Sequence, residues 1–263
     1  QQQQQQQQQP TILLVPHGAF CDSGPLVAQA FWGYLPKDVD TIILIGTEHS
    51  STSRNKIACS DHEKWRTPLG DVVVNQPLLE KVKQFIPVDR GAFSNEHSVE
   101  NQLPFLQDML DGQSWDMIAL SVHGNVEFND LTLISRAAKS LSELLQTVEQ
   151  KVAIVATSDY THAGPFYGEL PRRTDQSISD YIRSKDLPFL DFLCEPECLP
   201  PTINVWTIGR TISMCGLGAT LLTLELAKNL GRDKAKLLRY AVGSEICDRG
   251  LQDQTGFATL TFE

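Results

Sequence analysis

Residues 11–20 read TILLVPHGAF and residues 41–50 read TIILIGTEHS, and these two stretches decide the fold. Each begins with five apolar or β-branched residues and continues into a short turn that contains a glycine and a histidine. Short apolar runs bounded by turn residues are typical of strands that are buried on both faces of a parallel sheet. The segments Met117–Val122 and Val152–Ala156 repeat this pattern, so the sequence predicts at least four such strands.

Helical patterns lie between these strands, and the alternation predicts βαβ units. The predicted helices are Gly24–Gly33, Gln76–Phe85, Asn95–Leu110, Leu131–Val148 and Gly216–Leu230. In the third helix, Asn95 is a candidate N-cap, and Glu96 lies in the first turn, where the helix dipole favours an acidic side chain. Thr255–Phe262 alternates like a closing strand. We therefore predict a single α/β domain over residues 10–263, with a mostly parallel central sheet flanked by helices.

Two segments depart from this pattern. Four prolines crowd into Leu187–Asn204, and this composition predicts a mobile loop or lid. The tract Gln1–Gln9 has no apolar periodicity and cannot build a core, so we exclude it from the fold.

The composition excludes several classes of protein. The 263 residues include 22 Lys+Arg against 32 Asp+Glu, and the net charge of −10 disfavours binding to nucleic acid. No apolar run approaches the ~20 residues that a membrane-spanning helix needs, so we expect no membrane insertion. Six cysteines are too few for a disulfide scaffold, and no secretory signal segment opens the chain. We expect a cytoplasmic protein with reduced thiols.

Four of the six histidines follow directly after predicted strands. They are His17, His49, His123 and His162. Ligands of open α/β sheets bind in the crevice beyond the carboxyl ends of the strands, so imidazoles at these positions can converge on one site. Two neutral imidazoles with a third, anionic ligand form a usual first shell for a transition metal.

Each histidine also has a simpler interpretation, because a histidine at a strand end can serve only as a hydrogen-bonding loop residue. The neighbours Pro16 and Gly18 fix the strand exit at His17 and leave room for a ligand. We interpret His123 as structural and His62, which lies among charged residues, as a solvated surface residue.

Further candidates come from two other segments. Asp159 can orient the imidazole of His162 or hold it protonated, although a role in capping a turn explains Asp159 equally well. His97 stands near the positive end of the predicted helix dipole, where a neutral imidazole is favoured, and it is a candidate hydrogen-bonder beside the pocket or a cap residue.

Among the cysteines, Cys215 is the strongest metal-ligand candidate. It lies directly before an apolar predicted helix, and a helix N-terminus lowers the pKa of a thiol toward the metal-binding thiolate. A small buried hydrophobe is the alternative interpretation of Cys215. Cys194 and Cys198 have C-x-x-x-C spacing but no second ligand pair, so they support a structural zinc site only weakly.

Taken together, these motifs resemble the Memo protein family, from Pro10 to Phe262. The motifs that carry the resemblance, in family order and approximate spacing, are PHGAF (16–20), GTEH (46–49), WRTPLG (65–70), EHSVENQLPF (96–105), SDYTH (158–162) and CG (215–216). The long EHS-containing run and the RTPL segment are specific to the family.

The resemblance implies a fold like that of the class III extradiol dioxygenases, which are non-haem iron enzymes. It implies that His17, His49 and Cys215 are ligands of iron or copper. It also implies that Asp159, His162 and His97 lie beside the metal pocket.

This sequence departs from the family pattern at three places. Ser50 replaces a second histidine, Gly18-Ala19 inverts the usual order, and the segment after Cys215-Gly216 lacks a histidine and a proline that are often present. These differences concern the surroundings of the metal and the substrate preference.

We therefore expect a metal-dependent redox enzyme that holds Fe(II) or Cu and acts on a small-molecule substrate. In this hypothesis Asp159, His162 and His97 donate protons or orient the substrate. A thiolate in place of the carboxylate of the dioxygenases favours copper or changes the redox behaviour of iron, so aromatic ring cleavage is not assumed.

Two alternatives remain open. Zinc in the same shell would allow hydrolysis, which the resemblance disfavours. The chain can also be a non-catalytic module that binds a peptide or small anion in the same pocket, with help from Arg66, Arg172 and Arg173. Microbial members of the family are grouped with a radical-SAM partner protein, which is a further candidate partner.

Overall fold

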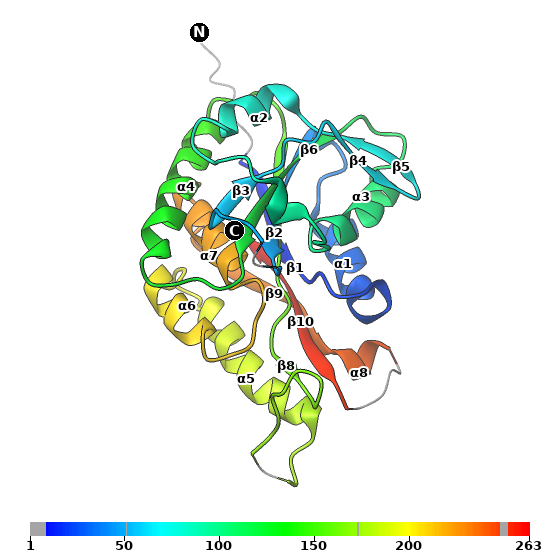
Figure 1. Ribbon diagram of the computed structural model, residues 1–263, viewed down its shortest axis with the longest axis vertical. Helices are drawn as coiled ribbons and strands as arrows, with labels where there is room; N and C mark the ends of the chain where they lie inside the picture. Colours follow the sequence, from blue (N-terminus) through cyan, green and yellow to red (C-terminus); the bar gives the residue numbers. More distant parts are fainter. Residues whose placement is uncertain (1–8, 51, 173, 248–251) are drawn as a thin grey trace.

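A central sheet organises the computed structural model, which describes residues 9–50, 52–172, 174–247 and 252–263. Its strand order is β3-β6-β2-β7-β1-β10-β8, and β9 pairs with β10 (Figure 1). The strands are β1 (Thr11–Val15), β2 (Thr41–Glu48), β3 (Ile57–Cys59), β6 (Asp116–His123), β7 (Val152–Thr157), β8 (His162–Ala163), β9 (Ala235–Val242) and β10 (Gln254–Phe262). The four central strands β6, β2, β7 and β1 run parallel, and antiparallel strands extend the sheet at both sides. The predicted α/β fold with a parallel core is therefore confirmed.

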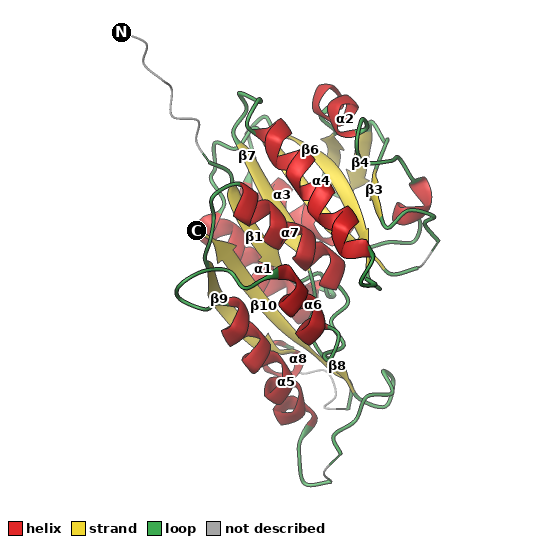
Figure 2. Cartoon of the chain, turned by 90° about the vertical axis from the view of Figure 1, so that its left-hand side faces the viewer, coloured by secondary structure: helices red, strands yellow, loops and turns green. Residues whose placement is uncertain are grey.

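Helices cover both faces of this sheet (Figure 2). On one face α7 (Leu217–Asn229) packs against all four central strands and against α4 (Asp130–Leu145). On the other face α1 (Phe20–Tyr34) packs against β1, β10 and the short helix α3 (Leu103–Met109). Residues 12–15 of β1 are all apolar rather than alternating with polar residues, because both faces of the strand are buried.

The remaining elements lie at the edges of this core. The hairpin of β4 (Lys64–Thr67) and β5 (Gly70–Val73) contacts α3, since Thr67 Oγ1 donates to Gln107 Oε1 at 2.5 Å. The other helices are α2 (Gln76–Val82), α5 (Ile178–Leu193), α6 (Thr202–Gly209), α8 (Gly243–Ile246) and the 3-10 helices at Arg90–Phe93 and Glu100–Gln102. No helix in the described ranges combines the length and the apolar character needed to cross a membrane.

The predicted helix Asn95–Leu110 is wrong in its first half. Asn95 has φ +57° and caps no helix, and the α-helix begins only at Leu103. The carboxylate of Glu96 accepts hydrogen bonds from the backbone N–H groups of His97 and Ser98 and from the neighbouring strand end. These contacts hold the segment in a loop, because they bind backbone groups in a geometry that is not helical.

The predicted loop Leu187–Asn204 is wrong at both ends, and only residues 194–201 lie outside helices. Helix α5 continues through Pro188 to Leu193, and α6 begins at Thr202. An interior proline costs a helix about 3 kcal/mol, whereas burying one large apolar side chain stabilises by about 1.5–3 kcal/mol. Phe189, Leu190 and Leu193 are all buried, so packing outweighs the effect of the proline.

Candidate metal centre

Five side chains with metal-binding atoms meet beyond the carboxyl ends of the central strands. His17 lies two residues after β1, His49 directly after β2, and Asp159 two residues after β7. Because β2, β7 and β1 are adjacent and parallel, their ends lie at the same edge of the sheet. His97 arrives from the loop before α3, and Cys215 precedes α7.

These side chains form two groups of three that share His17. In the first group, the ligating atoms of His17, His49 and His97 lie within 4.8 Å of one another. In the second group, the same holds for His17, Asp159 and Cys215. The predicted ligands His17, His49 and Cys215 are thus brought to one place, but they are divided between two groups, and His97 and Asp159 join them as potential ligands.

His17 is held at the centre from all sides. Its Nδ1 lies 2.9 Å from Thr157 Oγ1, its Nε2 lies 3.0 Å from Cys215 Sγ, and its backbone N–H donates to Asp159 Oδ1 at 2.8 Å. Burial lowers the pKa of this imidazole to about 4, although the charge of Asp159 acts in the opposite direction. The ring is therefore neutral at physiological pH, which is the form that binds a metal.

Glu96 orients the ring of His49. Its buried carboxylate lies 2.9 Å from His49 Nδ1 and also accepts the backbone N–H of His49 at 2.9 Å. Burial raises the pKa of Glu96, but the hydrogen bonds from His49 and from the backbone of Ser98 outweigh it and lower the pKa to about 2. A carboxylate on Nδ1 keeps Nε2 available as the ligand atom, which is a common arrangement around metal-binding histidines. The sequence interpretation missed this role, although the Glu-His pair at 96–97 was a visible signal.

Burial also sets the protonation of Cys215. The surrounding protein raises the pKa of its thiol well above the usual value, and the charge of Asp159 raises it further. The expectation that the N-terminus of α7 lowers this pKa is therefore wrong, because desolvation outweighs the helix dipole. The imidazole of His17 is therefore neutral, the carboxylate of Glu96 is ionised, and the thiol of Cys215 is protonated. None of the three carries a positive charge, so the site can accept a cation, and a bound cation would stabilise the thiolate form of Cys215.

His162 takes a different place from that of the other candidates. Its backbone N–H donates to Ser213 Oγ at 3.0 Å, and its Nδ1 lies 2.9 Å from the backbone oxygen of Ser213. The predicted contact with Asp159 is absent from its hydrogen bonds, because that carboxylate faces His17 and Gly18 instead. His162 thus holds Ser213 in place, and Cys215 follows Ser213 by two residues.

The other histidines agree in part with expectation. His62 is exposed and contacts Ser60 Oγ at 2.6 Å. His123 Nε2 lies 3.4 Å from Glu48 Oε2, and it lines the pocket beside the centre rather than serving only a turn.

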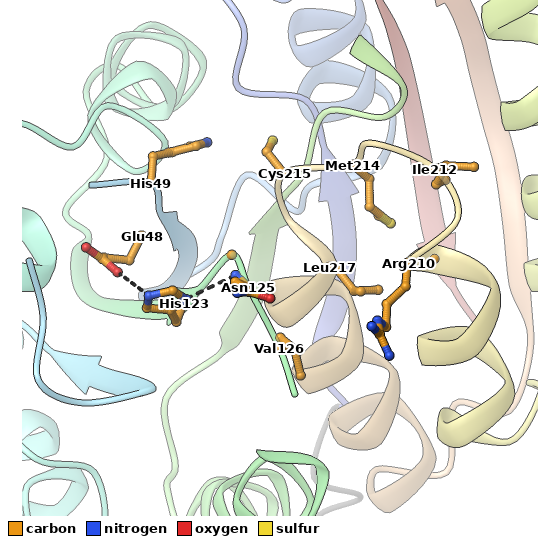
Figure 3. A pocket seen from close by; sticks show the side chains of 12 residues that line it. Glu48, His49, His123, Asn125, Val126, Arg210, Ile212, Met214, Cys215 and Leu217 are labelled. Carbon is orange, nitrogen blue, oxygen red and sulfur yellow. Dashed lines mark hydrogen bonds and ion pairs between the residues drawn. The ribbon is translucent and has the colours of Figure 1, made fainter. Parts of the chain in front are cut away.

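A cavity of about 410 Å³ opens beside the centre. Figure 3 shows His49 and Cys215 across the cavity from one another, with Arg210 and Leu217 at the far end. Ile212, Met214 and Leu217 lie on one side of the cavity together with Arg210, and the Glu48–His123 pair lies on the other (Figure 3). The cavity therefore suits a small molecule that has both polar and apolar parts.

Among the described residues that were also predicted to bind a metal or an anion, Arg66, Arg172, Cys194 and Cys198 do not line this cavity. Among the described residues, Cys194 and Cys198 belong to no group of three metal-binding side chains. Arg66 Nε binds Asp71 Oδ1 at 2.8 Å in the β4–β5 hairpin, and Arg173 lies outside the described residues.

Gly216 provides a test of how Cys215 is positioned. A Cβ at Gly216 would lie 2.5 Å from Ser158 Cβ and 2.6 Å from Ser158 Cα, so Gly216→Ala forces α7 and Cys215 away from β7. We expect a loss of about 1–3 kcal/mol in the free energy of unfolding and weaker metal binding, measured by denaturant titration and metal-buffered equilibration. In the control Gly33→Ala the new Cβ meets nothing within 4 Å, so stability should not fall. Unchanged stability and metal binding in Gly216→Ala would contradict this account.

Comparison with known proteins agrees with this architecture. The model of the family described as Memo-like protein matches residues 1–260. A MEMO1 family protein of Methanocaldococcus jannaschii is 30% identical over 247 residues, which cover 90% of this chain and 78% of that protein. One of Desulfurococcus amylolyticus is 30% identical over 255 residues, which cover 95% of this chain and 81% of that protein. A crystal structure of an uncharacterized protein from Escherichia coli K12 has TM-score 0.58 at 12% identity, covers 97% of this chain and 100% of its own, and shares the fold.

Proposed function

This chain belongs to the Memo family, and from that premise we propose that it is a metal-dependent redox enzyme that binds Fe(II) or Cu through His17, His49 and Cys215. One observation carries the proposal: the buried, neutral imidazole of His17 belongs to both groups of metal-binding side chains. Imidazole nitrogen suits both iron and copper, and a thiolate shifts the preference toward copper.

The donor set fits such an ion. Two imidazoles and one thiolate supply a single negative charge, and Asp159 adds a second beside them. When bound, a redox-active ion of this kind exchanges electrons with a substrate or with O2 and acts as a Lewis acid.

The remaining residues take roles that follow from their contacts. Glu96 and Thr157 hold the rings of His49 and His17 in fixed orientations. His97 is half-exposed and its ring stacks on that of His49 at 4.8 Å, so it is placed to take or give a proton at the pocket side of the centre. We assign His162 a positioning role through Ser213 rather than direct proton transfer.

The experiment compares metal content and turnover. Protein purified without oxygen should carry about one iron or copper ion per chain, and Cys215→Ser should bind it at least about tenfold more weakly. The wild type should consume O2 with a phenol or a thiol, and Cys215→Ser should do so far more slowly. Equal and negligible iron and copper in both proteins would overturn the proposal.

A second function is favoured by one observation. Arg210 lines the cavity, and a guanidinium there can hold the anionic group of a peptide or small molecule without any catalysis. If Arg210→Ala and His17→Ala both abolish peptide capture while the metal-loaded wild type never consumes O2, the binding module is the correct interpretation. Turnover by the wild type decides for the enzyme.

A further inference from the structure

A second group of metal-binding side chains lies apart from the first. Cys21 and Asp22 stand in the first turn of α1, and Cys247 follows α8 directly. One ligating atom from each lies within 4.8 Å of those of the other two, and all three residues are half-buried. The group shares no residue with the centre around His17.

We propose that Cys21, Asp22 and Cys247 form a second metal site that binds Zn²⁺. Two thiols separated by 226 positions (247 − 21) are brought together by the packing of α1 against α8. Because Cys247 comes from a different element than Cys21 and Asp22, the packing of the fold holds the three ligands together.

The donor set selects the ion. Thiolates exclude Ca²⁺ and Mg²⁺, which prefer oxygen ligands, and they favour thiophilic ions. With the carboxylate of Asp22, the site offers two sulfur ligands and one oxygen ligand. Zn²⁺ accepts both kinds of ligand in one tetrahedral site. Three protein ligands leave one position for water.

Charge supports the same assignment. The Sγ of Cys21 donates to Asp22 Oδ1 at 3.2 Å, so the thiol proton points at the carboxylate. Zn²⁺ would displace the thiol protons and offset two of the three negative charges that the two thiolates and the carboxylate then carry.

The site has its own small cavity. Asp22 and Cys247 line a space of about 130 Å³ together with Ser244 and Thr255, and this space is separate from the cavity beside Cys215. A bound ion there would connect α8 to the start of α1, which begins three residues after His17. The expected role is to stabilise this corner of the fold.

The test counts zinc and reactive thiols in the reduced full-length chain. With the first centre disabled by His17→Ala and His49→Ala, the protein should still bind about one Zn²⁺ in competition with a chelator. Zinc should protect two thiols from alkylation. Adding Cys21→Ser and Cys247→Ser should abolish both effects, whereas Cys198→Ser, which removes an exposed thiol outside the group, should change neither.

A second comparison covers the case in which the histidine variant does not fold. In an otherwise unchanged chain, Cys21→Ser with Cys247→Ser should bind one Zn²⁺ fewer than the wild type, with an unchanged circular dichroism spectrum. The proposal is overturned if zinc stoichiometry is the same in both, or if the two thiols form a disulfide and the reduced pair takes no zinc. These outcomes are independent of the iron or copper proposed at the first centre.

Discussion

Replacing His17 by alanine is expected to abolish metal binding at the first centre, with a larger effect than any other single substitution there. His17 is the one residue that both groups of ligands share, so its loss leaves two ligands in each. Removing a residue that only hydrogen-bonds to a metal ligand typically lowers metal affinity by about 10–100-fold. Since His17 is itself a ligand in both groups, we expect its removal to lower the affinity by more than about 100-fold. His97→Ala and Asp159→Asn each remove a member of only one group and should weaken binding less. Metal-buffered equilibration of each variant measures this order.

The matched control is His62→Ala, which removes an exposed side chain that contacts Ser60 and the ring of Trp65 and belongs to neither group of metal-binding residues. Its metal affinity should equal that of the wild type. Circular dichroism establishes that His17→Ala is folded, since the substitution also removes buried hydrogen bonds. If folded His17→Ala binds iron or copper as tightly as the wild type, the centre is not where we place it.

Replacing Glu96 by glutamine is expected to lower the free energy of unfolding by about 3–5 kcal/mol, the cost of breaking a buried charged network. The carboxylate accepts the backbone N–H groups of His49, His97 and Ser98 as well as His49 Nδ1. Glutamine offers one acceptor oxygen, and its amide group faces donors, so several of these N–H groups lose their partner. Denaturant unfolding of chelator-treated protein measures the loss.

The pH dependence gives a second signature of Glu96. Its pKa is lowered from 4.5 to about 2 by folding, so the folded state favours the ionised form. This stabilisation, about 3 kcal/mol, is fully present above pH 4.5 and is lost as pH falls toward 2. The difference between wild type and Glu96→Gln should therefore shrink in acid. Glu80→Gln, at an exposed position on α2, should show little difference at any pH.

How much of the fold could be predicted depends on which interactions decide each element. All four central strands were predicted, because their apolar runs and turn residues are local features. The segments 95–102 and 187–193 were predicted wrongly, because a tertiary hydrogen-bond network in one and buried apolar contacts in the other outweigh the local signals of asparagine and proline.

The candidate site divides in the same way. Histidines after β1 and β2 could be found from the sequence, since parallel neighbouring strands end at one edge whatever their order. The contact of Cys215 with His17 was expected from the family resemblance, and the structure places Sγ 3.0 Å from Nε2. The contact of Glu96 with His49 could not be predicted from spacing, because it depends on how the loop before α3 folds back over the sheet edge.

The sequence by itself determined the parallel strands, the position of the histidines at their ends and the family. Those properties follow from the order of residues along short segments, where side-chain periodicity and turn chemistry act locally. Only the tertiary structure decided that Cys215 stays protonated without a cation, that Glu96 supports His49, and that Cys21 meets Cys247. Protonation depends on burial, and burial and long-range contacts exist only once distant segments have packed together.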